Sequence, residues 1–347
     1  MSGLSSSNSG LGLPARLDAL SQKLRLGGHG ATILVHAQDP DPGASRVANA
    51  APAARVLCHD SYDGLPDLLA SEPIDACLSY RFGPGYPRAP LVEGPDRPAY
   101  VHVGGTGFDH LVPFEQSAVL VCNSAGFQAE VMADYALAAI LAINMRFPSF
   151  VAQQTRREWR EHNLRGARDQ AAVVLGTGPI GAAIAERLSV AGLFVTGVSR
   201  SGRAHPSFQT VVPVQDLRRV AAQAEHLVIA IPLTNESRGL VSREILNALR
   251  PGAGIVNLAR GGIVDEAALQ ERLKEGALGG AVFDVFETEP LPNHSPLWEA
   301  PGLIVTPHTS ALFEGWERAA ADVFCDNLHR LSRGEPLRNR IDPARGY

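Results

Sequence analysis

One short segment in the middle of the chain constrains the fold more than any other, because it reads as a strand that breaks into glycines and restarts as a helix. The apolar run Val173-Val174-Leu175 is followed directly by Gly176-Thr177-Gly178-Pro179-Ile180-Gly181. Gly176 permits a tight turn, Gly178 lets the backbone approach a ligand closely, and Gly181 lets the helix pack against the strand. The segment therefore predicts a site for the pyrophosphate of a dinucleotide.

The residues around and after these glycines support a helix at this place. Ile180, Ile184 and Leu188 recur at helical spacing, and Pro179 suits the first helical turn, where its missing amide costs nothing. The unpaired amides at the start of such a helix bind phosphate groups. A glycine-rich turn alone is a weak signal, but here the flanking strand and helix supply the context that the motif requires.

Length and composition narrow the class of protein. A chain of 347 residues is longer than a single hydrophobic core usually supports, so we expect two domains. The formal net charge is -5 and no run of Lys or Arg occurs, which argues against a nucleic-acid partner. The cysteines are widely spaced and form no CxxC pair, so we expect reduced thiols in a cytoplasmic protein and no metal site. They are Cys58, Cys77, Cys122 and Cys325.

Residues 1–30 are rich in Ser, Gly and Leu and lack the continuous apolar core of a secretory signal. We expect them to form a disordered or loosely docked N-terminal extension, with a transit peptide as the alternative. The longest apolar stretch, residues 135–143, is too short to span a bilayer. The sequence thus predicts a soluble protein with no membrane partner.

Two successive alternations of strands and helices predict an α/β fold with two doubly wound parallel sheets. The first has strand-like runs at 32–36, 55–58, 74–79, 100–103 and 119–122, and leads into an Ala-rich helix at about 129–145. The second has them at 171–175, 194–198, 227–231, 254–258, 280–283 and 303–305, before a last helix at about 313–331. We expect the last helix and the tail to return to the first domain, so that residues 31–125 and 313–347 form one domain and residues 126–312 the dinucleotide-binding domain, with hinges near Gly126 and Leu312.

Chemistry-bearing residues follow three strands of the second sheet. Ligands bind outside the carboxyl ends of parallel strands, and Arg260, Glu289 and His308 follow the strands at 254–258, 280–283 and 303–305. Taken alone, each of these residues is most simply an ordinary loop residue. The presence of all three beside a nucleotide-binding loop favours a catalytic set. Arg260 can grip a carboxylate, His308 can pass a proton to a developing alkoxide, and Glu289 beside the imidazole would raise its pKa. This set suits the reduction of a 2-oxo acid or the oxidation of a hydroxy acid.

The first domain is expected to supply further substrate contacts. Gly104-Gly105-Thr106-Gly107 follows the strand at 100–103, and its amides can hold a carboxylate, although a plain turn is the alternative. Arg81 follows another strand and is a further anion-binding candidate, although a surface arginine is the simpler interpretation.

From about Val101 to His308 the chain resembles the D-2-hydroxyacid dehydrogenases. The resemblance rests on motifs spread along this range rather than on one site. They are Gly105-Thr106-Gly107-Phe108-Asp109, residues 123–134 at the family's hinge, the 176–181 loop, Pro232-Leu233-Thr234-Asn235-Glu236-Ser237, Asn257-Leu258-Ala259-Arg260-Gly261-Gly262-Ile263-Val264-Asp265-Glu266, Asp284-Val285-Phe286-Glu287-Thr288-Glu289-Pro290, Ser295-Pro296-Leu297-Trp298 and Pro307-His308.

This resemblance implies a Rossmann cofactor domain, a discontinuous flavodoxin-like substrate domain and a cleft between them. It implies Arg260, Glu289 and His308 as the catalytic set, and it separates Glu289 from Glu287, which spacing alone does not. It also implies that Asp284 contacts the nicotinamide carboxamide, and that the chain forms a homodimer through the cofactor domain. The cofactor site is expected to include Ile231, Pro232, Leu258, Ala259, Arg260 and His308 as well.

Two departures from the family pattern stand out. NAD-using members usually carry an acidic residue at the end of the second cofactor-domain strand, where this chain has Ser199-Arg200-Ser201. An arginine between two hydroxyls suits a 2'-phosphate, so we predict NADPH in preference to NADH, with an exposed Arg200 as the alternative. The hinge carries Ala125-Gly126-Phe127-Gln128 where Pro-Gly-x-Asn is commoner, and this leaves the substrate contacts open.

The Ser-Arg-Ser turn and the ending 341–347 look most like the glyoxylate/hydroxypyruvate reductase branch. The leading hypothesis is therefore an NAD(P)H-dependent reductase of a small 2-oxo acid. Two alternatives stay open: a dehydrogenase of another small anion such as formate or phosphite, and a cofactor-sensing binding protein like the family's corepressor members.

Overall fold

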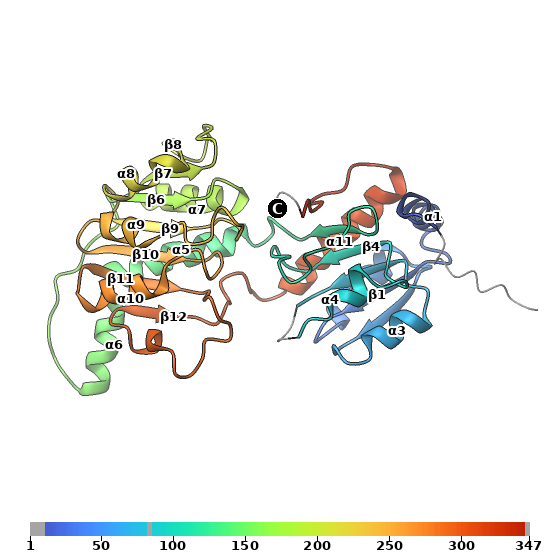
Figure 1. The fold of residues 1–347 in the computed structure, drawn as a ribbon, viewed down its shortest axis with the longest axis horizontal. Coiled ribbons are helices and arrows are strands. Elements are labelled where there is room, and N and C mark those ends of the chain that lie inside the picture. Colours follow the sequence, from blue (N-terminus) through green and yellow to red (C-terminus); the bar gives the residue numbers. More distant parts are fainter. Residues whose placement is uncertain (1–10, 82–84, 344–347) are drawn as a thin grey trace, which may run out of the picture. The chain divides into compact units, whose positions relative to one another are not determined.

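The structure is a computed structural model that describes residues 11–81 and 85–343. The chain forms two compact units, shown in Figure 1. The first unit comprises residues 1–127 and 314–347, and the second comprises residues 128–313. The backbone therefore passes from one unit to the other twice, once after Phe127 and once after Phe313.

The first unit is built on a five-stranded parallel sheet with the strand order β2-β1-β3-β4-β5. This is the order of flavodoxin-like folds. Its strands are β1 (Thr32–His36), β2 (Arg55–His59), β3 (Ala76–Ser79), β4 (Tyr100–Val103) and β5 (Leu120–Asn123). Its helices are α1 (Leu13–Arg25), α2 (Asp41–Ala50), α3 (Leu65–Ser71), α4 (Arg88–Val92) and α11 (Trp316–Arg333). Strands β1, β3, β4 and β5 are buried along their whole length, as expected for a parallel sheet covered on both faces.

Helix α1 departs from the expectation of a disordered or loosely docked extension, which is wrong for residues 13–25. Leu13 and Leu20 are buried, and Leu17 and Leu24 pack against the same core as Leu20. These leucines at helical spacing form an apolar stripe along one face of α1. The Ser21 hydroxyl also donates to the carbonyl of Leu331 in α11 at 2.8 Å. The leucine spacing is present in the sequence, but the apolar surface that buries it belongs to α11, at the other end of the chain.

The second unit contains a seven-stranded parallel sheet with the order β12-β11-β10-β9-β6-β7-β8. Its strands are β6 (Ala171–Leu175), β7 (Phe194–Ser199), β8 (Thr210–Pro213), β9 (His226–Ile229), β10 (Ala253–Asn257), β11 (Leu278–Phe283) and β12 (Leu303–Val305). Its helices are α5 (Ala129–Asn144), α6 (Phe147–Arg156), α7 (Pro179–Val190), α8 (Leu217–Ala221), α9 (Arg243–Ala248) and α10 (Glu266–Lys274), with single 3-10 turns at Val214–Asp216 and Pro296–Glu299. The sequence pattern does not predict β8, which is short, lies at the sheet edge and is only partly buried.

The two units together confirm the predicted α/β class with two parallel sheets. In the second unit the strand order reverses between β6 and β9, and ligands bind at such a switch point, outside the carboxyl ends of the strands. Separate apolar cores fill the two faces of this sheet, one of them centred on α5 and α7. The sheet is thereby held as a rigid base for the loops at its carboxyl edge.

Within residues 11–81 and 85–343, no single helix is both long and apolar enough to cross a membrane. The bent pair formed by α5 and α6, with an angle of 57° between them, passes the criterion of length and composition when its two helices are taken together.

Candidate active site

The glycine loop after β6 has the backbone geometry that its sequence predicts. Gly176 has a φ of +115°, a conformation that favours glycine, and a Cβ atom there would overlap the carbonyl of Ala230. A Cβ atom at Gly181 would overlap the carbonyl of Gly176, so the close approach of helix to strand requires glycine. Gly178 differs, because a Cβ atom there would meet no protein atom within 4 Å. The protein itself does not require glycine at position 178, whereas a ligand lying over the loop would.

The start of helix α7 is suited to an anion. Gly178 occupies the N-cap position, and no side chain caps the helix there. Pro179 fills the first helical position, and the other amides of the first turn are available to a phosphate. Together with the space above Gly178, this arrangement fits the pyrophosphate of a dinucleotide.

The turn after β7 carries the residues expected to choose between the two nicotinamide cofactors. The Ser199 hydroxyl accepts a hydrogen bond from the amide of Gly202 at 3.1 Å, and the Ser201 hydroxyl accepts one from the amide of Arg203 at 3.3 Å. The serines thus shape the turn, while Arg200 is exposed. Arg203 is a second exposed arginine in this turn, and its place three positions after Arg200 is the signal in the sequence that could have identified it.

The remaining expected cofactor residues also lie at the carboxyl edge of the sheet. Ile231 and Pro232 follow β9, and Leu258 and Ala259 follow β10. Leu258 and Ala259 are buried, Ile231 is half-buried and Pro232 is exposed.

Arg260 lies on a loop that side-chain hydrogen bonds fix to the end of β10. The Asn257 amide group donates to the carbonyl of Arg260 at 3.2 Å, and its oxygen accepts from the amide of Ala259 at 3.1 Å. A Cβ atom at Gly261 would overlap the backbone of Phe286, so the Arg260 loop packs directly against the loop that leads to Glu289. These two loops are held in a fixed relation by backbone packing.

Glu289 and His308 are in direct contact. The Nδ1 atom of His308 lies 2.7 Å from Oε2 of Glu289, with 39% of the histidine side chain and 26% of the glutamate side chain exposed. The other carboxylate oxygen of Glu289 accepts from the amide of Phe286 at 3.0 Å. A carboxylate only accepts hydrogen bonds, so Nδ1 carries the proton and Nε2 is the ring nitrogen left for a ligand.

The electrostatics of Glu289 link the three expected catalytic residues. Burial by itself raises the pKa of Glu289, but the hydrogen bond and charge of His308, the Phe286 amide and the charge of Arg260 outweigh it. The pKa of Glu289 therefore lies below its ordinary value, and the group is ionised at neutral pH. The structure thus brings a carboxylate, an imidazole and a guanidinium together at one edge of the sheet.

Glu266 is a second carboxylate near these loops, and its sequence pattern alone indicates no role for it. It begins α10, and its Oε1 atom accepts from the amide of Glu287 at 2.7 Å. Burial raises the pKa of Glu266, the bond from the Glu287 amide opposes the rise, and the charges of Glu287 and Glu289 add to it. Glu266 therefore supports the loop on which Glu289 stands.

Asp284 follows β11, is 1% exposed, and uses both of its carboxylate oxygens within the protein. It accepts hydrogen bonds from the Thr306 hydroxyl and from the amides of Thr309 and Ser310. Its contact with a nicotinamide carboxamide stays a prediction.

The glycine turn expected to bind substrate lies in the first unit, after β4. The Tyr80 ring occupies the space that a Cβ atom at Gly104 would need, so glycine is required there. The Asn123 amide group donates to the carbonyl of Thr106 at 2.6 Å, and the Ser124 amide donates to the carbonyl of Gly105 at 3.1 Å. These bonds fix the turn to the end of β5. Arg81 is exposed after β3, and its role as an anion contact stays a prediction, as do those of Gly105, Thr106 and Gly107.

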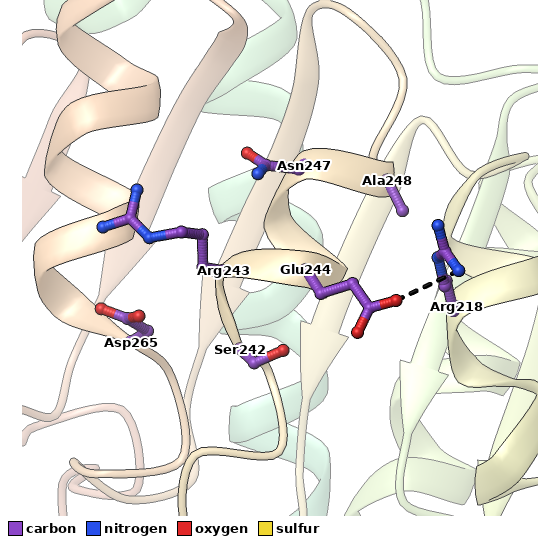
Figure 2. A pocket seen from close by; sticks show the side chains of 7 residues that line it. All are labelled: Arg218, Ser242, Arg243, Glu244, Asn247, Ala248 and Asp265. Carbon is purple, nitrogen blue, oxygen red and sulfur yellow. Dashed lines mark ion pairs between the residues drawn. The ribbon is translucent and has the colours of Figure 1, made fainter.

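A pocket of about 660 Å³ lies elsewhere on the second unit, as Figure 2 shows. Six of its seven lining residues are polar or charged, and Arg218 pairs there with Glu244 at 3.1 Å. Neither the glycine loop nor Arg260, Glu289 or His308 lines it. The pocket is therefore separate from the candidate active site.

Comparison with known proteins identifies the family. The model described as "D-isomer specific 2-hydroxyacid dehydrogenase, NAD binding domain" matches residues 137–310, which lie within the second unit. The chain belongs to the D-isomer specific 2-hydroxyacid dehydrogenase family. This 2-hydroxyacid dehydrogenase is accordingly an NAD(P)-dependent enzyme that acts on small 2-oxo or 2-hydroxy acids, and the predicted resemblance is confirmed.

Its relatives include reductases and NADPH complexes. Glyoxylate/hydroxypyruvate reductase A of Salmonella choleraesuis is 35% identical over 216 residues, which are 62% of this chain and 69% of that protein. A D-isomer specific 2-hydroxyacid dehydrogenase from Xanthobacter autotrophicus Py2, solved with NADPH and MES, has 33% identity and a TM-score of 0.78, covering 91% of this chain and 99% of that one. An NADPH-dependent glyoxylate/hydroxypyruvate reductase from Sinorhizobium meliloti, solved with NADP and sulfate, has 26% identity and a TM-score of 0.75, covering 91% of this chain and 100% of that one.

Proposed function

We propose that this 2-hydroxyacid dehydrogenase reduces a small 2-oxo acid, such as glyoxylate or hydroxypyruvate, to the corresponding D-2-hydroxy acid with NADPH. The observation that carries the proposal is the contact of 2.7 Å between His308 Nδ1 and Glu289 Oε2, with the charge of Arg260 acting on the same carboxylate. The similarity to proteins named glyoxylate/hydroxypyruvate reductase supports the substrate class.

Each of the three side chains has a task in this reaction. Arg260 binds the substrate carboxylate through its planar guanidinium and polarises the neighbouring carbonyl. His308 donates the proton on Nε2 to the carbonyl oxygen as the oxygen gains charge. Glu289 holds the imidazole through Nδ1 and stabilises its protonated form. The nicotinamide supplies the hydride when it is bound.

These residues, the nicotinamide and solvent account for every atom transferred in the reaction. The carbonyl carbon gains a hydride, the carbonyl oxygen gains the proton of His308, and a 2-hydroxy acid leaves while His308 takes a proton back from solvent. The first unit, as the substrate domain, adds the amides of Gly105, Thr106 and Gly107 and the side chain of Arg81 as further contacts for the carboxylate.

The preference for NADPH rests on the turn after β7. Residues 199–203 offer Arg200 and Arg203 and contain no carboxylate, so the turn suits a 2'-phosphate and lacks the acidic side chain that would bind both ribose hydroxyls. Two of the similar structures were solved with NADPH or NADP, which supports this preference.

A homodimer formed through the cofactor domain is part of the proposal. Large apolar side chains are exposed on α6 and on the extended segment after it, which Figure 1 draws along the outside of the second unit. Trp159 is 98% exposed, Val151 63%, Phe147 57% and Leu164 50%. Apolar side chains that gather on one surface segment mark an interface, and a second copy of this chain is the partner that the family resemblance implies.

The direct test follows NADPH oxidation by the purified protein with glyoxylate, hydroxypyruvate and a panel of larger 2-oxo acids. We expect turnover with the two small acids and loss of turnover in His308→Ala, with the affinity for NADPH retained. Formate and phosphite with NADP are run as alternative substrates. Cofactor binding without turnover on any of these compounds would contradict the proposed reaction and favour a cofactor-sensing binding protein.

A further inference from the structure

Three successive amides of the turn that carries His308 all donate to one residue, Asp284. The His308 amide donates to the backbone carbonyl of Asp284 at 2.8 Å, the Thr309 amide to its Oδ1 atom at 2.8 Å, and the Ser310 amide to its Oδ2 atom at 2.9 Å. His308 itself has a φ of +51°, in the left-handed region that residues other than glycine rarely occupy. Such a conformation persists only where its surroundings hold it, and here Asp284 supplies the bonds that do so.

Asp284 is in turn held by two hydroxyl groups in series. The Thr306 hydroxyl lies 2.6 Å from Asp284 Oδ1, and the Tyr135 hydroxyl lies 2.6 Å from the Thr306 hydroxyl. Because the carboxylate can only accept, Thr306 donates to Asp284, and Tyr135 must then donate to Thr306. Tyr135 is half-buried in α5, and burial raises the pKa of its hydroxyl, so the group keeps its proton at neutral pH.

Asp284 has almost no contact with solvent, since it is 1% exposed. A buried carboxylate is stable only when hydrogen bonds satisfy it, so loss of the Thr306 hydroxyl cannot readily be made good by water. The bonds that Asp284 makes to the amides of residues 308–310 would then loosen with it. The line of contacts thus runs from α5 through Thr306 and Asp284 to the backbone of His308.

We propose that Tyr135 and Thr306 are positioning residues for His308, which act through Asp284 to hold the imidazole in place for proton transfer. Neither of them touches the reacting atoms in this scheme. The proposal rests on the proposed function, because it takes His308 as the proton donor. The structural part of the proposal is that these contacts hold the backbone of residues 308–310 in place. It can be measured even in a protein that shows no enzyme activity.

The first measurement is amide hydrogen exchange of the segment 306–310 in the full chain without cofactor. In Thr306→Val we expect exchange at residues 308–310 to quicken about tenfold or more, because one buried carboxylate bond is lost. Thr306→Ser keeps the hydroxyl and should restore the slow exchange. Tyr135→Phe should give a smaller increase, and the double variant should be no faster than Thr306→Val, because both changes break the same line of contacts.

The second measurement is steady-state kinetics on the same variants. We expect kcat to fall about tenfold in Thr306→Val, with a smaller change in the dissociation constant of NADPH, and Thr306→Ser to stay close to the wild type. Thr210→Val, at an exposed position in β8, is the matched control and should change neither quantity. Should Thr306→Val fail to fold, Tyr135→Phe compared with Thr306→Ser gives the same contrast.

The outcomes separate the two proposals. Unchanged exchange at residues 308–310 in Thr306→Val and Tyr135→Phe would overturn the positioning role, and so would faster exchange with an unchanged kcat in an active enzyme. A wild-type protein that turns over no 2-oxo acid would defeat the proposed function instead. Exchange would in that case still report whether the two hydroxyls hold the His308 turn.

Discussion

His308 Nδ1 and Glu289 Oε2 lie 2.7 Å apart, although the two residues stand on loops that follow different strands. The contact places a proton on Nδ1, where Glu289 accepts it, and leaves Nε2 as the ring nitrogen that can bind a substrate. The second oxygen of Glu289 is held by the Phe286 amide, so the carboxylate has little freedom to turn away. The pair therefore acts as one unit, and its members can be tested separately.

Replacing Glu289 by Gln should lower kcat/KM for the 2-oxo acid by about tenfold to a hundredfold, because the amide no longer stabilises a protonated imidazole. The pKa of Glu289 is lowered, so its charge is present at neutral pH and the loss should be visible there. Glu287→Gln is the matched control, since that side chain is 66% exposed and lies 3.9 Å from Arg238. Equal losses in the two variants would argue against a specific role for Glu289.

The glycine loop allows a prediction that separates binding from folding. Gly178→Val should fold with only a small loss of Tm, from the poorer N-cap, because no protein atom lies within 4 Å of the new Cβ atom, but its affinity for NADPH should fall at least tenfold. Gly181→Ala should show the reverse, with a lower Tm as its main effect, because its Cβ atom overlaps the carbonyl of Gly176. Thermal unfolding and fluorescence titration with NADPH measure the two effects. A Gly178→Val protein that binds NADPH as tightly as the wild type would mean that the pyrophosphate does not lie over this loop.

Cofactor choice is tested at the turn after β7. Arg200→Asp should weaken the binding of NADPH and strengthen that of NADH, because a carboxylate repels a 2'-phosphate and accepts bonds from ribose hydroxyls. We expect the ratio of the two kcat/KM values to change by about a hundredfold or more, since a charge-assisted hydrogen bond is worth about 1.5 to 3 kcal/mol and is replaced by a repulsion. Arg203→Asp serves as the comparison within the same turn. If Arg200→Asp leaves both affinities as they were, Arg200 does not contact the 2'-phosphate.

The sequence predicted most of the second unit because its signals are local. The glycines at 176–181 fix a strand, a turn and a helix together, and the parallel strands bring Arg260, Glu289 and His308 to one edge by their order alone. Spacing did not separate Glu289 from Glu287, because both stand on the same loop. The structure separates them, since Glu289 contacts His308 whereas the Glu287 side chain is 66% exposed.

Other features could not be predicted because they depend on contacts between distant parts of the chain. The Tyr135 and Thr306 hydroxyls are 171 positions apart, and neither residue stands out in its own segment. Strand β8 has only one buried residue, so its pattern does not differ from that of a loop. Helix α1 depends on the apolar surface of α11, which lies at the other end of the chain.

Buried histidines predict a loss of stability in acid. His226 in β9 bonds to Gln170 at 2.8 Å, and burial together with the charge of Arg165 lowers its pKa to about 3. At pH values between about 3 and 6.5, His226 therefore carries a proton in the unfolded chain but not in the folded chain. The free energy of unfolding should therefore fall as the pH falls below 6.5, by about 1 kcal/mol per pH unit for this group.

His226→Gln should remove that part of the pH dependence. Urea unfolding of the wild type and the variant at several pH values between 5 and 8 measures it. At pH 8, His226 is neutral in both the folded and the unfolded wild type. The difference in the free energy of unfolding between the wild type and the variant at this pH therefore gives the packing cost of the substitution alone. The wild type should then lose more stability than the variant as the pH is lowered. Parallel curves for the two proteins would show that His226 is not held neutral by the fold.

The exposed apolar segment from α6 onward predicts the oligomeric state. Trp159 is 98% exposed, and a tryptophan at the centre of an interface commonly contributes about 2 kcal/mol or more to association. Trp159→Glu should therefore raise the dimer dissociation constant at least thirtyfold, with no change in the Tm of the monomer, because the side chain has almost no partner within its own chain. Val190→Glu, at an 88% exposed position at the end of α7, is the control and should leave the dimer intact. Sedimentation equilibrium measures both constants. A wild-type monomer, or a Trp159→Glu dimer of unchanged affinity, would mean that this segment does not form the interface.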